Sequence, residues 1–204
     1  LRHDTAFRAV YSRATYVTAD GMPVAKLAQR QCASMKRTTG ADLVMPLCRE
    51  AARHGLPVFF FGASDRTLQA ASQRLQKQFP GLIISGIRAP PQGFDPDSAD
   101  ADAYARLIAE SGTRLCFIAL GAPKQEIFAE KILAHDDTIG AIAIGAALDF
   151  LAGEKKRAPA FFQAYGLEWF WRLSSEPNRL FNRYMACATL LASIVSQEII
   201  QAVA

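Results

Sequence analysis

The chain has 204 residues, of which half are hydrophobic and 21% are charged, and its formal net charge is +4. This balance excludes an intrinsically disordered chain, and the length suits one domain with an appendage. The small positive excess is compatible with phosphate groups, lipid head groups or nucleic acid as partner. The sequence has no run of about 18 uncharged apolar residues, so we do not expect a membrane-spanning helix.

The cysteines do not follow a metal-binding or disulfide pattern, since no C-x-x-C pair occurs. We interpret them as reduced, buried thiols of a cytosolic protein; they are Cys32, Cys48, Cys116 and Cys187. The chain opens at Leu1 with no signal peptide and no initiator methionine. We therefore expect the natural protein to extend further at its N-terminus.

Short runs of branched and aromatic residues alternate with segments of helical period, which is typical of a parallel sheet with helical crossovers. The predicted strands, in chain order, are 14–18, 57–61, 82–87, 114–119 and 139–144. Helices are predicted near Met22 or Pro23 and at 42–54, 64–79 and 98–111. The pattern predicts an α/β fold with a Rossmann-like, mostly parallel sheet flanked by helices. Ligands of such sheets bind beyond the carboxyl ends of the strands.

After Phe150 the pattern changes, because two helical segments follow, at about 160–173 and 177–203, and no further strand. We predict a Rossmann-like domain at 1–153 and a helical C-terminal appendage at 154–204. The appendage contains Arg172, Arg179 and Arg183 beside an apolar face. A basic amphipathic helix suits an anionic membrane surface or a lipid diphosphate, and equally a helix packed on the core or on another subunit.

Asp20-Gly21 follows the first predicted strand, where a parallel sheet places functional groups. Asp20 is therefore a candidate general base. It also fits the N-cap of a helix that begins near Met22 or Pro23. The sequence leaves both interpretations open.

A second candidate segment runs from Lys36 to Asp42 and joins two cations to hydroxyl groups just before a helix. Phosphate oxygens could bind Arg37, Thr39 and the free backbone amides there. The alternative is a solvated loop in which Thr39 or Asp42 caps the helix.

The strongest local signal is Gly121-Ala-Pro-Lys-Gln-Glu126, which follows the strand at 114–119 and opens a helix. Backbone amides, Lys124 and Gln125 would gather at the strand end, as a diphosphate or sugar pocket requires. The alternative is a plain strand-to-helix turn. The turn at Gly145 would also admit a ligand to the backbone, or else serve tight packing. The turn Phe61-Gly-Ala-Ser64 is weak evidence for a site.

Asp95-Pro-Asp97 and Asp100-Ala-Asp102 spell the D-x-D pattern of metal-dependent sugar transferases. Acids in a proline-rich loop and in a first helical turn have a simpler explanation in the helix dipole. We therefore predict no essential metal and no cofactor, and we assign the three histidines no catalytic role. The chain also lacks the glycine fingerprint of dinucleotide-binding proteins, which argues against a dehydrogenase.

Several segments, taken together and in order, resemble the WecG/TagA/CpsF glycosyltransferases. They are Ala19-Asp-Gly-Met-Pro23, Thr39-Gly-Ala-Asp-Leu43, Gly121-Ala-Pro-Lys-Gln-Glu126, Asp149-Phe-Leu-Ala-Gly153, Lys156-Arg-Ala-Pro159, Gly166-Leu-Glu-Trp169, Glu176-Pro177 and Arg183-Tyr184. The resemblance covers nearly the whole chain.

This resemblance implies inverting, metal-independent transfer of a hexose or N-acetylhexosamine, commonly of the N-acetylmannosamine type, from a UDP-sugar. The acceptor would be an undecaprenyl-diphosphate-linked sugar, used for teichoic acid or exopolysaccharide at the inner face of the cell membrane. Asp20 would be the base, Arg37 would stabilise the diphosphate and Gln125 would hold the donor. The complete set of expected binding residues is Arg37, Thr39, Gly121, Lys124, Gln125, Gly145, Asp149, Arg172, Arg179 and Arg183.

The sequence departs from the family pattern at Gly145-Ala-Ala-Leu148, where members usually have Gly-Gly-Ala-Phe. Members also carry a Thr/Asn-containing turn ahead of the Asp-Gly segment, and this chain starts after it. The competing function is a non-catalytic, membrane-attached nucleotide-binding module. A homo-oligomer fits the apolar faces of the appendage.

Overall fold

The computed structural model describes residues 5–159, 161–162 and 165–203, apart from some side chains of the first and last helices. The chain forms two compact units. One contains residues up to Asp20 together with Thr38–Lys156, and the other contains Gly21–Arg37 together with the described residues from Arg157 onward. These two units are defined by their internal contacts, which do not show whether either part folds independently. The predicted division into domains at 1–153 and 154–204 therefore stays a prediction.

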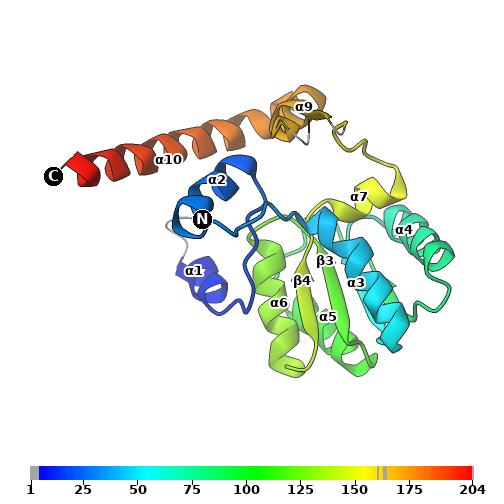
Figure 1. The fold of residues 1–204 in the computed structure, drawn as a ribbon. Helices are drawn as coiled ribbons and strands as arrows, with labels where there is room; N and C mark the ends of the chain where they lie inside the picture. The colour runs from blue at the N-terminus through cyan, green and yellow to red at the C-terminus, as the bar shows by residue number, and fades with distance from the viewer. Residues whose placement is uncertain (1–4, 160, 163–164, 204) are drawn as a thin grey trace. The chain divides into compact units, whose positions relative to one another are not determined.

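The first unit contains a four-stranded parallel sheet in the order β2-β1-β3-β4 (Figure 1). The strands are β1 (Val58–Gly62), β2 (Ile84–Arg88), β3 (Leu115–Ala119) and β4 (Gly140–Ala143). β1 lies between β2 and β3, with Phe60 paired to Ile87 on one side and to Phe117 on the other. The predicted α/β fold is confirmed, and four of the five predicted strands form within two residues of their expected positions.

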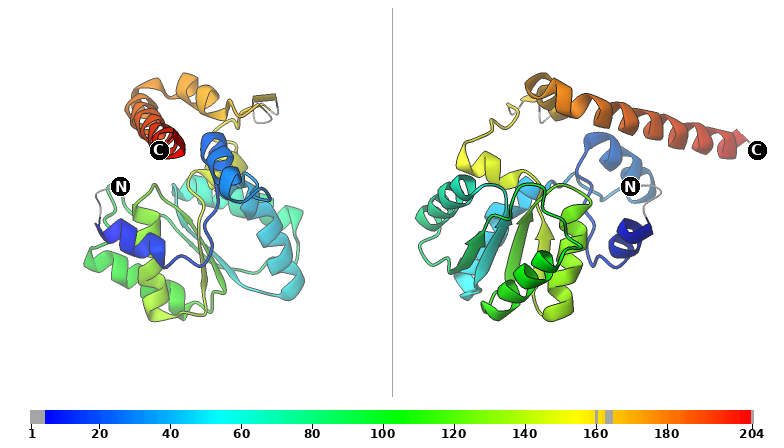
Figure 2. Two further views of the ribbon diagram at one scale, coloured as in Figure 1. Left: turned by 60° about the vertical axis from the view of Figure 1, so that its left-hand side comes forward. Right: turned by 180° about the vertical axis from the view of Figure 1, so that it is seen from behind.

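Helices cover both faces of this sheet. Helices α3 (Gly40–His54), α4 (Asp65–Gln78) and α7 (Ala147–Ala152) pack on one face, and α5 (Ala99–Glu110) and α6 (Lys124–His135) pack on the other. Figure 1 shows α3 on the near face, and the right panel of Figure 2 shows the green helices α5 and α6 from behind. Helix α1 (Thr5–Ser12) contacts α6.

Phenylalanine side chains of β1 build the two cores, because alternate residues of a strand point to opposite faces. Phe60 stacks on Phe117 in the core beneath α3 and α4, with ring centroids 5.3 Å apart. Phe61 faces the opposite core, where its ring centroid lies 4.3 Å from that of Phe128 and 5.5 Å from that of Phe94. All of β1 is buried, as its unbroken apolar run predicts.

The helix boundaries follow from capping residues. Thr39 caps α3 through a capping box with Asp42, and the left-handed Gly55 at φ 61° ends the helix. Ser64 caps α4 and Ser98 caps α5, each by accepting a bond from a backbone N–H three residues later. Three of the predicted helices therefore form close to their expected limits.

The predicted strand at 14–18 is wrong. These residues are exposed, Tyr16 to 90%, and they form no strand. Ala19 alone makes a bridge, through its carbonyl oxygen, which accepts from the backbone N–H of Thr38 at 3.0 Å. β propensity measures how well a residue packs on a half-buried sheet surface. Residues 14–18 have no neighbouring strand, so their β propensity does not lead to a strand.

The second unit is helical in its described part. It contains α2 (Met22–Gln31), α9 (Glu168–Ser175) and α10 (Pro177–Val203), and the rings of Trp169 and Tyr184 pack edge to face between α9 and α10. The helix predicted at 160–173 is interrupted: residues 161–162 are helical, a turn with the left-handed Gly166 at φ 72° follows, and α9 begins at Glu168. None of the described helices combines the length and apolar character needed to cross a bilayer.

The prediction of four buried thiols is correct for two. Cys48 and Cys116 are buried, and burial raises the pKa of the Cys48 thiol to about 12. Cys32 and Cys187 are exposed. A hydrogen bond with the Ser34 hydroxyl, 3.2 Å away, lowers the pKa of Cys32. The apolar neighbours of these two cysteines in the sequence do not cover them in the structure.

We expect Phe61→Ala to lower the free energy of unfolding by about 3–5 kcal/mol, because it leaves a cavity among several aromatic rings. Urea unfolding measures this change. The control is Tyr16→Ala, an aromatic truncation at an exposed position, for which we expect less than about 0.5 kcal/mol. Equal losses for both variants would contradict the placement of 14–18 outside the sheet.

Candidate active site

The order of the strands creates a switch point between β1 and β3. The chain leaves β1 into α4 on one face of the sheet and leaves β3 into α6 on the other. The two connections diverge at the carboxyl edge, which is where ligands bind in open α/β sheets. This edge of the first unit is therefore the place to look for a site.

The turn after β1 makes a close backbone contact at this edge. Gly62 has φ 100°, and a Cβ there would lie 2.5 Å from the carbonyl oxygen of Ala119. The next residue, Ala63, has φ 58° and donates its N–H to the same oxygen at 3.1 Å. A left-handed alanine costs roughly 1 kcal/mol or more. The turn Phe61–Ser64, weak evidence in the sequence, thus lies at the centre of the switch point.

Gln125 and Gly145, both predicted binding residues, lie in contact. The backbone N–H of Gly145 donates to Gln125 Oε1 at 3.1 Å. Gln125 Nε2 in turn donates to Glu126 Oε1 at 2.9 Å. The structure therefore joins the first turn of α6 to the turn after β4, and it adds Glu126 to the group.

Lys124 makes a contact that the sequence did not indicate. Its ammonium group donates to the backbone carbonyl oxygen of Phe94 at 2.5 Å. The Phe94 ring is buried beside Phe61 and Phe128, so the proline-rich loop is held at two points. Binding of a ligand by Lys124 stays a prediction, and in this structure its cation fastens a loop.

The N-terminus of α3 lies against the end of β4. A Cβ at Gly40 would lie 2.7 Å from the Cα of Ile144, so only glycine permits this approach. Thr39 is buried, and its hydroxyl both donates to Asp42 Oδ2 at 2.8 Å and accepts from the Asp42 N–H at 3.2 Å. The capping alternative for Thr39 is confirmed, and its role in binding stays a prediction.

Asp20 directly follows Ala19, whose carbonyl oxygen accepts from the backbone N–H of Thr38, the residue before the N-cap of α3. Its side chain is exposed. The N-cap of α2 is Gly21, so Asp20 does not take the cap position that the sequence allowed. Its assignment as general base stays a prediction.

Gly121 and Asp149 also lie in turns and first helical turns beyond the strands. Gly121 is exposed, and a Cβ there would meet nothing within 4 Å, so the backbone is open to a ligand. Asp149 lies in the first turn of α7, and its Oδ2 is 3.5 Å from the ammonium nitrogen of Lys155. Binding by either residue is an untested prediction.

In the second unit, one carboxylate brings together two of the predicted arginines. Glu168 Oε2 accepts from Arg37 Nη1 at 3.2 Å, and Glu168 Oε1 lies 3.8 Å from Arg172 Nη2. The side chains of Arg37 and Glu168 are 19% and 13% exposed. Two guanidinium groups on one carboxylate form a compact cationic cluster. The side chains of Arg179 and Arg183 lie outside the described residues.

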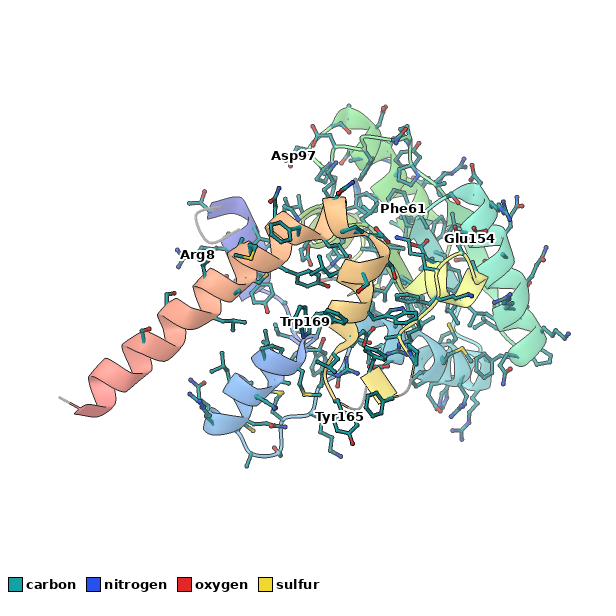
Figure 3. The ribbon with its side chains drawn as sticks, turned by 90° about the horizontal axis from the view of Figure 1, so that it is seen from above. Arg8, Phe61, Asp97, Glu154, Tyr165 and Trp169 are labelled. Carbon is teal, nitrogen blue, oxygen red and sulfur yellow. The ribbon has the colours of Figure 1, made fainter. Side chains whose placement is uncertain are left out.

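The D-x-D carboxylates have local partners. Asp95 Oδ1 accepts from the Asp97 N–H at 3.0 Å, and Asp102 Oδ1 lies 3.0 Å from His135 Nε2. That hydrogen bond is the main cause of the lowered pKa of Asp102. Asp97 lies at the margin of its unit, whereas Phe61 is enclosed by side chains (Figure 3). Within the described ranges, no three His, Cys, Asp or Glu residues form a metal-binding group.

Sequence reasoning missed two acidic residues that touch predicted ligand groups, Glu126 and Glu168. Both stand inside segments that carry the family resemblance, beside Gln125 and Trp169. Their partners could not be read from the sequence, because one contact crosses 131 residues and the other depends on a side-chain rotamer.

Comparison with known proteins identifies the family of the chain. The model of the glycosyl transferase WecG/TagA/CpsF family matches residues 1–203. The chain belongs to the WecG/TagA/CpsF family. The resemblance in the sequence is thereby confirmed, and with it the prediction of a glycosyltransferase.

One curated relative in this family is a Bacillus spizizenii protein, the N-acetylglucosaminyldiphosphoundecaprenol N-acetyl-beta-D-mannosaminyltransferase of strain ATCC 23059 / NRRL B-14472 / W23. It is 31% identical over 195 residues, which is 94% of this chain and 72% of the relative.

We expect Glu168→Gln to lower the free energy of unfolding by about 1–3 kcal/mol, because it leaves two cations on a neutral, half-buried partner. Urea unfolding tests this effect. The control is Glu50→Gln, whose ion pair with Arg53 is exposed on both sides, and we expect less than about 0.5 kcal/mol there. An equally small loss of unfolding free energy in both variants would show that the Glu168 cluster does not stabilise the fold.

Proposed function

We propose that this chain transfers a sugar from a UDP-sugar to an undecaprenyl-diphosphate-linked sugar during assembly of a cell-surface polymer. The donor sugar is a hexose or N-acetylhexosamine of the N-acetylmannosamine type. The observation that carries the proposal is the joining of Gln125 and Gly145 at the switch-point edge, in a chain of this family. The name of the Bacillus relative supports both the sugar type and the lipid-diphosphate acceptor.

Asp20 acts as the general base in this proposal. It takes the proton from the acceptor hydroxyl as that oxygen attacks the anomeric carbon from the side opposite the diphosphate. The new glycosidic bond forms while the bond from the anomeric carbon to the phosphate oxygen breaks, so the configuration inverts and UDP leaves with the electron pair. The Asp20 side chain is exposed, so an acceptor hydroxyl can reach its carboxylate.

The developing charge on UDP is stabilised by fixed donors and cations rather than by a metal. In the first unit these are the Gln125 amide, the open backbone at Gly121 and the N-terminus of α3 near Thr39. Gly145, whose N–H binds Gln125 Oε1, offers the ligand space rather than a donor. In the second unit, Arg37, Arg172, Arg179 and Arg183 are proposed separately to bind anionic groups. Asp149 and Lys124 complete the proposed donor-binding set.

The second unit is also proposed to attach the enzyme to the inner face of the cell membrane. Its described residues expose large apolar side chains beside the arginines, and aromatic rings with cations are suited to a lipid–water interface. At least half exposed among its C-terminal residues are Phe161, Tyr165, Phe170, Phe181 and Met185. The same surface is available for self-association, so a homo-oligomer belongs to the proposal.

UDP release from a panel of UDP-sugars, with a polyprenyl-diphosphate-GlcNAc acceptor, tests the function. We expect turnover that requires the acceptor and persists in EDTA. Asp20→Asn should lower kcat by about a hundredfold or more and leave the Kd for UDP within about twofold, because the base acts in the chemical step. Asp97→Asn is the matched control, a carboxylate removed from a D-x-D motif, and should retain turnover.

Three outcomes would overturn parts of the proposal. If EDTA abolishes turnover and Mg²⁺ restores it, the enzyme requires a metal, and Asp95 and Asp97 become candidate metal ligands. Tight UDP binding without turnover for any donor would identify a non-catalytic module. Normal turnover by the Asp20→Asn variant would show that Asp20 is not the general base.

A further inference from the structure

Gln125 is held by two neighbours of opposite hydrogen-bonding character. The Gly145 N–H can only donate, and it donates to Oε1 at 3.1 Å. The Glu126 carboxylate can only accept when ionised, and it accepts from Nε2 at 2.9 Å. A flipped amide would set donor against donor and acceptor against acceptor. Both neighbours therefore select the same orientation of the amide.

The sequence around Glu126 explains why its carboxylate is available. Glu126 is the third residue of α6, where a glutamate ordinarily reaches back to the backbone N–H of the N-cap. The N-cap here is Pro123, which has no N–H. The carboxylate therefore has no capping donor to bind, and one of its oxygens binds the side chain of Gln125 instead.

The second carboxylate oxygen of Glu126 indicates that this residue does not stabilise the fold. Glu126 Oε2 is enclosed by protein and makes no hydrogen bond. A buried acceptor without a partner costs free energy, so an apolar side chain of the same size would be tolerated at least as well. The presence of a carboxylate at this position needs a reason other than folding.

We propose that Glu126 is a positioning residue, which fixes the orientation of the Gln125 amide and so leaves one defined N–H of that amide for the ligand. Two hydrogen bonds use one Nε2 proton and one Oε1 lone pair, and one donor and one acceptor site stay open. The Gly145 N–H, bonded to Oε1, withdraws electron density through the amide and so strengthens the Nε2 donor that faces the ligand. The kinetic part of this inference rests on the proposed transfer from a UDP-sugar.

Side-chain amide NMR tests the positioning without any substrate. We expect the Gln125 NH₂ pair, identified by its loss in Gln125→Ala, to show two widely separated proton shifts. Glu126→Met should bring these shifts close to those of a free amide, and Glu126→Gln, which keeps a carbonyl acceptor, should restore most of the separation. An exposed control, Glu110→Met in α5, should leave the pair unchanged.

Kinetics and stability complete the test. Glu126→Met should lower kcat/KM for the donor about tenfold, the effect of one lost hydrogen bond, with no fall in unfolding temperature. Glu126→Gln should recover most of that loss. In the Gln125→Ala background, Glu126→Met should cause no further loss, since the residue acts through Gln125.

The outcomes separate this inference from the proposed function. A Gln125 NH₂ pair that is unchanged in Glu126→Met, or kinetic losses that add in the double variant, would overturn the positioning role. A loss of stability in Glu126→Met equal to its loss of activity would show a structural role instead. If the wild-type protein transfers no sugar at all, the proposed function fails, and the NMR result alone still decides the role of Glu126.

Discussion

Backbone contact between the ends of β1 and β3 governs the site-bearing unit. Gly62 approaches the Ala119 carbonyl so closely that a side chain would not fit, and Ala63 accepts an unfavourable backbone conformation to bond the same oxygen. The contact continues the parallel pairing of β1 with β3 to the point where the two chains diverge toward opposite faces of the sheet. The open edge exists because this contact holds the two turns together at their base.

Acidic side chains organise the groups that are proposed to bind the anionic donor. Asp42 engages the Thr39 hydroxyl, Glu126 orients Gln125, and Glu168 holds Arg37 and Arg172. Each carboxylate thus fixes a donor or a cation rather than facing a substrate itself. Preorganisation of this kind matters for catalysis, because donors that already point at the departing charge need no reorganisation in the transition state.

The parts of the fold that could be predicted from sequence are those with local causes. Ser64, Ser98 and Gly55 fix helix ends by capping, and the apolar run of β1 marks a strand buried on both faces. The segment 14–18 has the residues of a strand but lacks a neighbour, which no local pattern reveals. The link from Gln125 to Gly145 is only suggested by two separate motifs, since the order of the strands sets their proximity.

The grouping of Gly21–Arg37 with residues after Arg157 has a consequence for biosynthesis. The Arg37–Glu168 ion pair closes a loop of 131 residues. At a typical rate of translation, α2 is synthesised roughly 10 s before its partners in the same unit. All four strands of the sheet, which end at Ala143, are synthesised before Glu168, so the Arg37–Glu168 ion pair forms only after the sheet residues have been made.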